Sequence, residues 1–269
     1  MPQIRLERAD DPCVQEYRAV SEPELVRDSG LFIAEGRLVV RRAIEEGRCR
    51  VRSLLLSETA RRDLEPVLGR LPEDVPIYIS AARDLMTITG FDMHRGCLAL
   101  VHRPAVLSAE TVLGTARVVV ILEAVANADN VGGVFRNAAA FGADAVLLSP
   151  SCCDPLYRKA IRTSMAAVLQ VPFARIADWP RGLATLGARG FTIVGLTPRG
   201  PAQTLDSFAA ARPARLALLV GNEGLGLSRE AEAAAHHLVR VPIRPAVDSL
   251  NLVVATGIAL SRLTNLGDL

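Results

Sequence analysis

The sequence predicts an α/β protein made of two parts, in each of which strands alternate with helices. Short apolar runs, such as VVVIL at 118–122 and LALLV at 216–220, are separated by segments of helical length. Continuous apolar strands that alternate with helices are typical of a parallel sheet covered by helices on both faces. The chain has 269 residues, of which 50% are hydrophobic, so it can bury the core of one large domain or two ordinary ones.

The first hundred residues predict a small α/β module. Residues 1–30 have a polar, helical pattern. Beyond them, apolar runs and helical periodicity predict strands at 31–34, 50–57, 76–80 and 97–102, and helices at 36–46, 58–68 and 81–88. Gly47 and Gly69 are expected to end the first two of these helices, and Pro66 is expected to interrupt the second.

The stretch 103–114 (RPAVLSAETVLG) mixes proline, serine and glycine without a strong period, which favours a domain boundary. We therefore predict a first domain at 1–105, a linker at 106–114 and a second domain at 115–269. In the second domain the alternation of strand and helix resumes. It predicts strands at 117–123, 144–149, 171–175, 191–196, 215–220 and 238–243, and helices at 131–141, 156–168, 179–188, 227–236 and 248–264.

Composition excludes several classes of protein. The formal net charge is only +2, so any contact with nucleic acid must come from local clusters of basic residues. Five cysteines without a CxxC pair fit a reducing compartment, and the histidines lie in no metal-ligand spacing, so we expect no metal. No apolar run approaches the roughly twenty residues of a membrane span, and the N-terminus is unlike a signal peptide. We therefore expect a soluble, cytoplasmic protein with no membrane association.

A glycine loop, Gly221–Gly226 (GNEGLG), lies between the strand expected at 215–220 and the helix expected from 227. A strand, a glycine-rich loop and a helix in this order bring backbone groups close to a ligand. A tight turn without a ligand is the alternative for an isolated loop of this kind. The chain contains no GxGxxG, GK[ST], HExxH or GxSxG motif, so the loop matches none of these common sites.

A second stretch, 126–137 (ANADNVGGVFRN), follows the first strand of the second domain. Asp129 or Asn130 is expected to cap the helix that begins there. On a helical wheel Arg136 lies opposite the apolar positions and among glycines and alanines. Two glycines at the start of a helix lower its stability. Their presence therefore indicates that another backbone or a ligand must approach this helix closely. A solvated surface arginine is the alternative.

A third stretch, 154–164 (DPLYRKAIRTS), combines basic, aromatic and hydroxyl side chains. Arg158, Lys159 and Arg162 are candidates for phosphate contacts, and Tyr157 is a candidate for stacking on a base. A helix with a solvated basic face is the alternative.

A fourth stretch, 241–252 (VPIRPAVDSLNL), leads into the last helix. Asp248 or Ser249 is expected to cap that helix, which leaves free N–H groups in its first turn. Asn251 lies at the start of an otherwise apolar helix and needs a hydrogen-bond partner. Simple capping is the alternative, and it explains Ser249 better than Asn251.

Three of these stretches, read in order as NxxNxGxxxR, GNEGxG and (V/I)P(I/M)…SLN, resemble the three motifs of the SpoU/TrmH-type RNA 2′-O-ribose methyltransferases of the SPOUT superfamily. The resemblance covers roughly residues 117–265, and it is specific because the three motifs occur in order with compatible spacing. The N-terminal part, through FIAEGRLVVRRAIEEG and ITGFDMHRGCLALV, is similar to the substrate-binding domain of many rRNA-modifying members. That domain in turn is similar to ribosomal proteins that bind kinked RNA.

The resemblance implies a fold and a cofactor. The C-terminal segment of the parallel-sheet domain would form a deep trefoil knot, in which S-adenosylmethionine binds in a bent form against the backbone of three loops. Two such knotted domains would form a homodimer. By matching positions, the cofactor would contact Leu196, Thr197, Gly221, Asn222, Glu223, Gly224, Val241, Ile243, Leu250 and Asn251.

The resemblance also implies an activity, the transfer of a methyl group from S-adenosylmethionine to a ribose 2′-hydroxyl of RNA. The family's functional polar positions fall on Asn130, Arg136, Glu223, Ser249 and Asn251. In the family the arginine is held to activate the hydroxyl, but a guanidinium group has a pKa above about 12 and does not readily lose a proton. We therefore expect Arg136 to hold the adjacent phosphate and to stabilise the developing alkoxide. Arg37 and Arg41, on the helix at 36–46, join Tyr157, Arg158, Lys159 and Arg162 as expected RNA contacts.

The sequence departs from the family pattern at three positions. Asn127 stands where an aspartate is frequent, Ala166 replaces a usual glycine, and Pro245 stands where a glycine is usual. The expected substrate is rRNA, because smaller tRNA-modifying members often lack the N-terminal domain. A tRNA methyltransferase, a resistance methyltransferase acting on large-subunit rRNA, and a non-catalytic RNA-binding or assembly factor remain alternatives. An NAD-binding Rossmann oxidoreductase is a more distant one.

Overall fold

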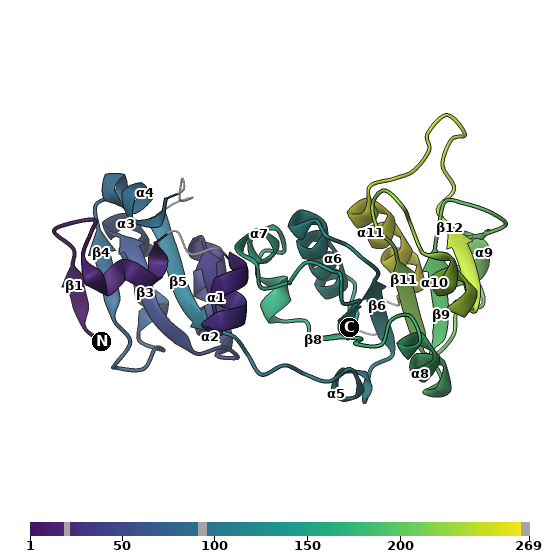
Figure 1. The fold of residues 1–269 in the computed structure, drawn as a ribbon, viewed down its shortest axis with the longest axis horizontal. Helices are drawn as coiled ribbons and strands as arrows, with labels where there is room; N and C mark the ends of the chain where they lie inside the picture. Colours follow the sequence, from purple (N-terminus) through teal and green to yellow (C-terminus); the bar gives the residue numbers. More distant parts are fainter. Residues whose placement is uncertain (19–21, 91–95, 265–269) are drawn as a thin grey trace. The chain divides into compact units, whose positions relative to one another are not determined.

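The computed structural model describes residues 1–18, 22–90 and 96–264, and its chain forms two compact units (Figure 1). Unit 1 comprises Met1–Ala105 and Pro155–Leu169, and unit 2 comprises Val106–Asp154 and Gln170–Leu269. The division after residue 105 coincides with the predicted end of the first domain. The segment Pro155–Leu169, which we predicted as part of the second domain, groups with unit 1. Residues 91–95, within the predicted motif ITGFDMHRGCLALV, lie outside the described residues.

Unit 1 has a mixed sheet whose described strands follow the order β1-β4-β3-β5-β2. β1 and β3 run parallel to β4, whereas β2 and β3 run antiparallel to β5. The strands are β1 (Gln3–Arg5), β2 (Leu31–Glu35), β3 (Val51–Ser57), β4 (Ile77–Ser80) and β5 (Cys97–His102). The prediction of a helical N-terminus was wrong at β1, because Gln3–Arg5 is held extended by pairing with β4.

Helices of unit 1 lie against this sheet. Those before residue 105 are the 3-10 helix η1 (Pro12–Tyr17), α1 (Glu22–Asp28), α2 (Arg37–Glu46), α3 (Glu58–Leu68) and α4 (Ala82–Thr89); the helices of Pro155–Leu169 are described below. Side chains of η1, α1 and α4 form one buried cluster with alternate residues of β2 and β5 and with Leu55 of β3. We predicted that Pro66 would interrupt α3, and this was wrong. Pro66 lies inside the helix, and the buried side chains of Val67 and Leu68 hold its last turn in place.

Unit 2 has a sheet in which all the described strands are parallel, in the order β10-β12-β9-β11-β6-β7-β8. The predicted parallel sheet is therefore confirmed. The strands are β6 (Val118–Leu122), β7 (Ala145–Leu148), β8 (Phe173–Arg175), β9 (Thr192–Leu196), β10 (Gln203–Thr204), β11 (Leu216–Val220) and β12 (His237–Arg240). β12 ends earlier than predicted, because Pro242 has no N–H group for the ladder. The trefoil knot implied by the resemblance stays a prediction.

Helices cover both faces of this sheet, as predicted (Figure 1). α5, α8 and α10 share a buried cluster with alternate residues of β6 and β11, and α11 packs against α6 and α9 on the opposite face. The helices of unit 2 are α5 (Ala109–Leu113), α6 (Ala128–Ala140), α8 (Gly182–Ala188), α9 (Leu205–Ala209), α10 (Arg229–Ala234) and α11 (Leu252–Leu263). α5 lies within the predicted linker, yet its Val112 and Leu113 are buried in the core of the unit. Throughout the described part of the chain, every helix is too short or too polar to cross a membrane.

The predicted helix at 156–168 is broken. α7 (Arg158–Thr163) ends early, and a 3-10 helix, η3 (Ala167–Leu169), follows it. Between them Met165 and Ala166 have φ of +54° and +68°. This left-handed region favours glycine, because an L side chain is strained there. The backbone therefore explains why a glycine is usual in the resembled family where this chain has Ala166.

Candidate cofactor and RNA site

A cavity of about 550 Å³ lies in unit 2 where β9, β11 and β12 end. In open parallel sheets, ligands bind outside the carboxyl ends of the strands, and this volume is typical of a small-molecule site. Three loops form the walls, one after each of these strands. All of the residues predicted to contact the cofactor line this cavity, namely Leu196, Thr197, Gly221, Asn222, Glu223, Gly224, Val241, Ile243, Leu250 and Asn251.

The glycine loop is both a tight turn and a wall of the cavity. A Cβ atom on Gly221 would clash with the backbone of Gly226 and Leu227, and Gly226 has φ of +72°. The backbone N–H of Asn222 donates to the carbonyl of Gly226 at 3.1 Å, and the N–H of Gly226 donates back at 2.9 Å. The two glycines are thus required for the chain to close on itself directly after β11.

The side chain of Asn222 holds this turn from inside. Its Oδ1 accepts hydrogen bonds from the N–H groups of Gly224 at 2.8 Å and Leu225 at 3.1 Å. Its Nδ2 donates to the carbonyl of Ala124 at 2.9 Å, in the loop after β6. Three of the four hydrogen-bonding positions of this amide are thus used within the protein. Asn222 therefore shapes the cavity wall, and its contact with a cofactor stays a prediction.

The three motif stretches meet through a chain of side-chain hydrogen bonds. Asn251 Nδ2 donates to Asn130 Oδ1 at 3.4 Å, and Asn130 Nδ2 donates to Glu223 Oε1 at 2.7 Å. The hydrogen bonds of Asn251 fix the orientation of its amide, and this in turn fixes the orientation of the Asn130 amide. Asn251 Oδ1 caps α11 by accepting from Val253 and Val254, so its amino group must face Asn130, whose own amino group must then face the carboxylate. Glu223 is thereby held at the rim of the cavity.

Both predicted helix caps were wrong, and the two errors have one cause. Asn127, and neither Asp129 nor Asn130, caps α6 by accepting from the N–H of Asp129 at 2.8 Å. Asn251, and neither Asp248 nor Ser249, caps α11; the latter two line the cavity instead. In each case the stretch offers several capping residues, and the tertiary contacts decide which one is used. The departure at Asn127 matters little to the cap, because an amide oxygen accepts as a carboxylate does.

Arg136 is exposed on α6 and is absent from the lining of the cavity. Val131, Val134 and Phe135 are fully buried on the other side of the helix, as the helical wheel predicted. The close approach predicted from the glycines comes from α11. A Cβ atom on Gly133 would lie 2.6 Å from a methyl group of Val253. Within the described residues, Arg136 has no hydrogen bond or ion pair, so its guanidinium group is available to a ligand.

The arginines of α2 predicted to contact RNA have partners within unit 1. Arg37 forms an ion pair with Asp63 of α3, and Arg41 Nη2 donates to the backbone carbonyl of Asp63 at 2.7 Å. These contacts join α2 to α3. An exposed ion pair such as that of Arg37 contributes little stability and can exchange for a phosphate, and Arg41 binds only a backbone carbonyl, so RNA contacts by the two arginines stay a prediction.

The predicted RNA contacts around α7 also have partners. Arg158 Nη1 lies 3.1 Å and Arg162 Nη1 lies 3.7 Å from the same oxygen of Glu35, whose side chain is fully buried at the end of β2. A buried carboxylate requires such a partner. Tyr157 and Lys159 also have interactions within the protein. Their RNA contacts likewise stay a prediction.

Sequence reasoning missed two residues whose side chains bind the glycine loop or the residues just after it. Glu123 follows β6 directly and is 5% exposed; its carboxylate accepts from Trp179 Nε1 at 2.8 Å and from the N–H and hydroxyl of Ser228 at 2.9 and 2.7 Å. An acid directly after an apolar strand was a signal for it. Arg199 lines the cavity and donates to the glycine loop. Nothing in the sequence distinguished Arg199 from the other arginines.

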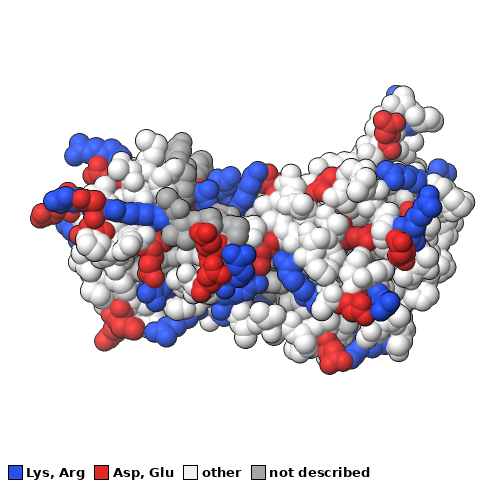
Figure 2. Space-filling model, in the orientation of Figure 1, with Lys and Arg blue, Asp and Glu red and all other residues white. Residues whose placement is uncertain are grey.

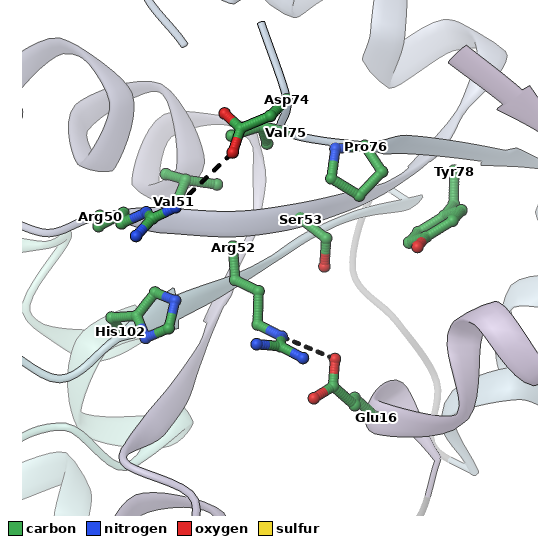
Figure 3. Close-up of a pocket in the computed structure, with 10 residues that line it drawn as sticks. All are labelled: Glu16, Arg50, Val51, Arg52, Ser53, Asp74, Val75, Pro76, Tyr78 and His102. Carbon is green, nitrogen blue, oxygen red and sulfur yellow. Dashed lines mark hydrogen bonds and ion pairs between the residues drawn. The ribbon is translucent and has the colours of Figure 1, made fainter. Parts of the chain in front are cut away.

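A second hollow, of about 370 Å³, lies at one end of the sheet of unit 1 (Figure 3). Arg52 Nε lies 2.9 Å from Glu16 Oε2, and Arg50 Nη2 lies 3.7 Å from Asp74 Oδ2. Partial burial raises the pKa of the Tyr78 phenol in its wall, so this group stays neutral. Figure 2 shows the same mixing of charges, with basic and acidic side chains interspersed over the face in view. The hollow therefore offers no excess of positive charge to an anion.

The structure has the fold of solved RNA methyltransferases. It matches an AdoMet-bound rRNA methyltransferase from Sinorhizobium meliloti with a TM-score of 0.80 and 23% identity, over 97% of each chain. It matches the structure of an RNA 2′-O ribose methyltransferase with a TM-score of 0.77 and 23% identity, again over 97% of each chain. At this level of identity the two matches establish the fold.

Sequence comparisons establish the family. The family model described as the SpoU rRNA Methylase family matches residues 117–261, which is more than half of the chain. An uncharacterised tRNA/rRNA methyltransferase of Mycobacterium tuberculosis (strain ATCC 25618 / H37Rv) is 39% identical over 268 residues, covering 96% of this chain and 90% of the relative. The chain therefore belongs to the SpoU rRNA methylase family and is an RNA methyltransferase.

Proposed function

We propose that this protein transfers a methyl group from S-adenosylmethionine to a ribose 2′-hydroxyl of structured RNA, with rRNA as the substrate. One observation carries the proposal. The three motif stretches, far apart in the sequence, meet in the hydrogen-bonded chain Asn251–Asn130–Glu223 at the rim of a cavity of ligand size. Such a convergence of polar groups on one cavity is the usual mark of an active site.

The residues present fit S-adenosylmethionine. The cavity is lined by apolar side chains such as Val241, Ile243 and Leu250, which suit a purine ring, and by polar groups such as Thr197 and Glu223, which suit its ribose and amino acid parts. The glycines of the loop after β11 let backbone groups approach the ligand closely. When bound, the cofactor supplies a methyl group already activated on a sulfonium centre. The AdoMet-bound relative from Sinorhizobium meliloti supports this assignment.

Arg136 is the residue we assign to the ribose hydroxyl. A guanidinium group stays charged in proteins and binds phosphate oxygens in two-point contacts. Arg136 would hold the phosphate next to the reacting ribose and stabilise the negative charge that develops on the 2′-oxygen. The proton would pass to that phosphate or to water. The absence of a partner for Arg136 among the described residues supports this role, since no internal ion pair has to be broken first.

The remaining polar residues would shape the site. Asn130 and Asn251 fix the carboxylate of Glu223, and Ser249 lies in the loop that closes the cavity. Because the donor is already activated, the main task of these residues is to align cofactor and ribose for in-line transfer. Pro245 suits its loop, since the N–H of Val247 donates to the carbonyl of Arg244 at 3.0 Å and proline is favoured at the second position of such a turn.

We further propose that the protein acts in the cytoplasm as a homodimer formed through a knotted unit 2. Exposed apolar side chains support the dimer: Val247, in the loop that projects from unit 2 in Figure 1, is 49% exposed, and Val254 of α11 is 50% exposed. Such side chains are suited to burial against another surface. Unit 1 supports rRNA over tRNA as the substrate, because it resembles the domain of rRNA-modifying members.

Two measurements test the proposal. Isothermal titration calorimetry of the purified protein with S-adenosylmethionine should give saturable binding, and no heat at millimolar ligand would exclude the cofactor. Mapping 2′-O-methyl groups in RNA from a deletion strain should reveal one or more rRNA sites that lose methylation and regain it on complementation. Loss confined to tRNA would replace the substrate, and an unchanged methylation pattern would favour a non-catalytic RNA-binding or assembly factor.

A further inference from the structure

One side chain joins two of the three loops around the cavity. Arg199 lies in the loop after β9; its Nη1 donates to the carbonyl of Leu225 at 2.9 Å and its Nη2 to the carbonyl of Gly224 at 3.4 Å. We infer that Arg199 is a positioning residue for S-adenosylmethionine: it holds the glycine loop in the shape that receives the cofactor and presents Glu223. The inference rests on the proposed function and extends it to a residue outside the three motifs.

The glycine loop needs such a contact. Three of its six residues are glycines, so holding it in one conformation has a large entropic cost. Burial does not anchor its tip, because Leu225 is 79% exposed. Asn222 binds the N–H groups of Gly224 and Leu225 from inside the turn. Arg199 binds the carbonyls of the same two residues, so the peptide groups at the tip are held from both sides.

Arg199 is itself fixed at its base. Its backbone N–H donates to Thr197 Oγ1 at 3.2 Å, and the N–H of Thr197 donates to the carbonyl of Val239 at 2.9 Å. Thr197 is only 4% exposed. The loop after β9 is therefore continuous with the sheet, and Arg199 transmits this rigidity to the glycine loop. A charged donor makes a stronger hydrogen bond to a carbonyl than a neutral one does.

The contact with Gly224 reaches Glu223 through the backbone. The peptide group between Glu223 and Gly224 is planar, and the next one carries the carbonyl that Arg199 binds. Fixing this carbonyl limits the backbone angles next to Glu223, whose Oε1 accepts from Asn130. Arg199 thus acts on the cofactor through the loop, and its loss should weaken cofactor binding far more than RNA binding.

The test uses full-length Arg199→Ala and Arg199→Lys, with Arg212→Ala as control, since Arg212 is exposed in unit 2 and has no partner among the described residues. Calorimetry should show a roughly tenfold weaker Kd for S-adenosylmethionine and S-adenosylhomocysteine in Arg199→Ala. The KM for S-adenosylmethionine should rise by the same factor, with the KM for RNA within about twofold. The Kd and KM of Arg199→Lys for S-adenosylmethionine should lie between those of the wild type and Arg199→Ala, because an ammonium group is a compact point charge without the planar fork of the guanidinium group. The control should match the wild type.

A second readout needs no cofactor. Amide hydrogen exchange of the peptide spanning 221–227 in the free protein should be faster in Arg199→Ala, with other peptides unchanged. Unchanged exchange together with an unchanged Kd would overturn the inference. If Arg199→Ala unfolds, Arg199→Lys decides by the same two measurements. A wild-type protein that does not bind S-adenosylmethionine would remove the proposed function, and the exchange result would still show whether Arg199 holds the loop.

Discussion

The two units each contain a hollow lined by charged and polar groups, but these groups are used differently. In unit 1 the arginines around the hollow of Figure 3 each face a carboxylate. Arg37 of α2 faces Asp63, and Arg158 of α7 faces Glu35. In unit 2, polar side chains at the cavity form a hydrogen-bonded chain that ends on Glu223. The side chain of Arg136, in the same motif stretch as Asn130, has no partner among the described residues.

The comparison teaches that a basic residue or a cavity does not by itself identify a site. A side chain already bound to an internal partner must first be released before it can bind a ligand. The free energy that it contributes to ligand binding is then reduced by the free energy of the internal hydrogen bond or ion pair that is lost. Side chains that the fold orients but does not neutralise are therefore better candidates for chemistry. The following variants test that distinction, beginning with the largest expected effect.

Arg136→Ala should lower the rate of methyl transfer by about a hundredfold or more, because one donor to a developing oxyanion contributes on this scale. The Kd for S-adenosylmethionine should stay within about twofold, since Arg136 does not line the cavity. Single-turnover transfer of a radiolabelled methyl group to RNA measures the rate, and calorimetry measures the Kd. Transfer at the wild-type rate would mean that the catalytic arginine is assigned wrongly. Arg212→Ala, which removes an exposed arginine of unit 2 outside the motifs, is the matched control and should retain activity within about twofold.

Asn130→Ala should break the chain between Asn251 and Glu223 and lower the rate about tenfold to a hundredfold. It should also lower the free energy of unfolding by about 1–3 kcal/mol, because the amide is 8% exposed and its partners lose their hydrogen bonds. Activity assays and urea unfolding measure the two effects. Ser261→Ala, at an exposed position of α11, is the control and should change neither. An Asn130→Ala protein with normal activity would show that the chain is only structural.

Arg158→Ala should destabilise unit 1 by about 2 kcal/mol, because it removes the nearer cation from the buried carboxylate of Glu35. Arg162, at 3.7 Å, should compensate in part. The free energy of unfolding measures the effect, and RNA affinity at two salt concentrations measures any added phosphate contact. If stability is unchanged and only RNA affinity falls, the arginine faces RNA and the ion pair with Glu35 is unimportant.

Arg52→Ala should have the smallest effect, within about 0.5 kcal/mol in stability and twofold in RNA affinity. Its side chain is 46% exposed, and its ion pair with Glu16 is of the kind that contributes little. Thermal unfolding and an RNA gel-shift titration measure both quantities. A loss of RNA affinity greater than fivefold would make the hollow of Figure 3 an RNA site and would remove the distinction between the two units.

Much of the architecture could be predicted from local patterns. Runs such as VVVIL and LALLV can only be buried on both faces, so the parallel sheet of unit 2 followed from them directly. The points at which helices end were harder to predict. The helix predicted at 156–168 ends early because the chain takes two left-handed residues at Met165 and Ala166, which nothing in their composition demands.

The candidate site divides in the same way. The motif residues at the cavity were recognisable, because the glycines at 221 and 226 and the asparagine at 251 line it, the asparagine at 130 bonds to its rim, and all four are unusual in their settings. The partners of these residues were not. Which of several capping residues begins α6 and α11, and which arginine holds the glycine loop, depends on segments brought together only by folding.

The sequence by itself determined the alternation of strands and helices, the family and the residues that gather at the cavity. These rest on periodicity and on motifs whose members are close in the chain. Only the tertiary structure decided that Asn130 joins Glu223 to Asn251, that Arg199 binds the glycine loop, and that Arg37, Arg158 and Arg162 face carboxylates. Hydrogen bonds and ion pairs reach only a few ångströms, so they follow from the three-dimensional neighbours of a side chain and not from its position in the sequence.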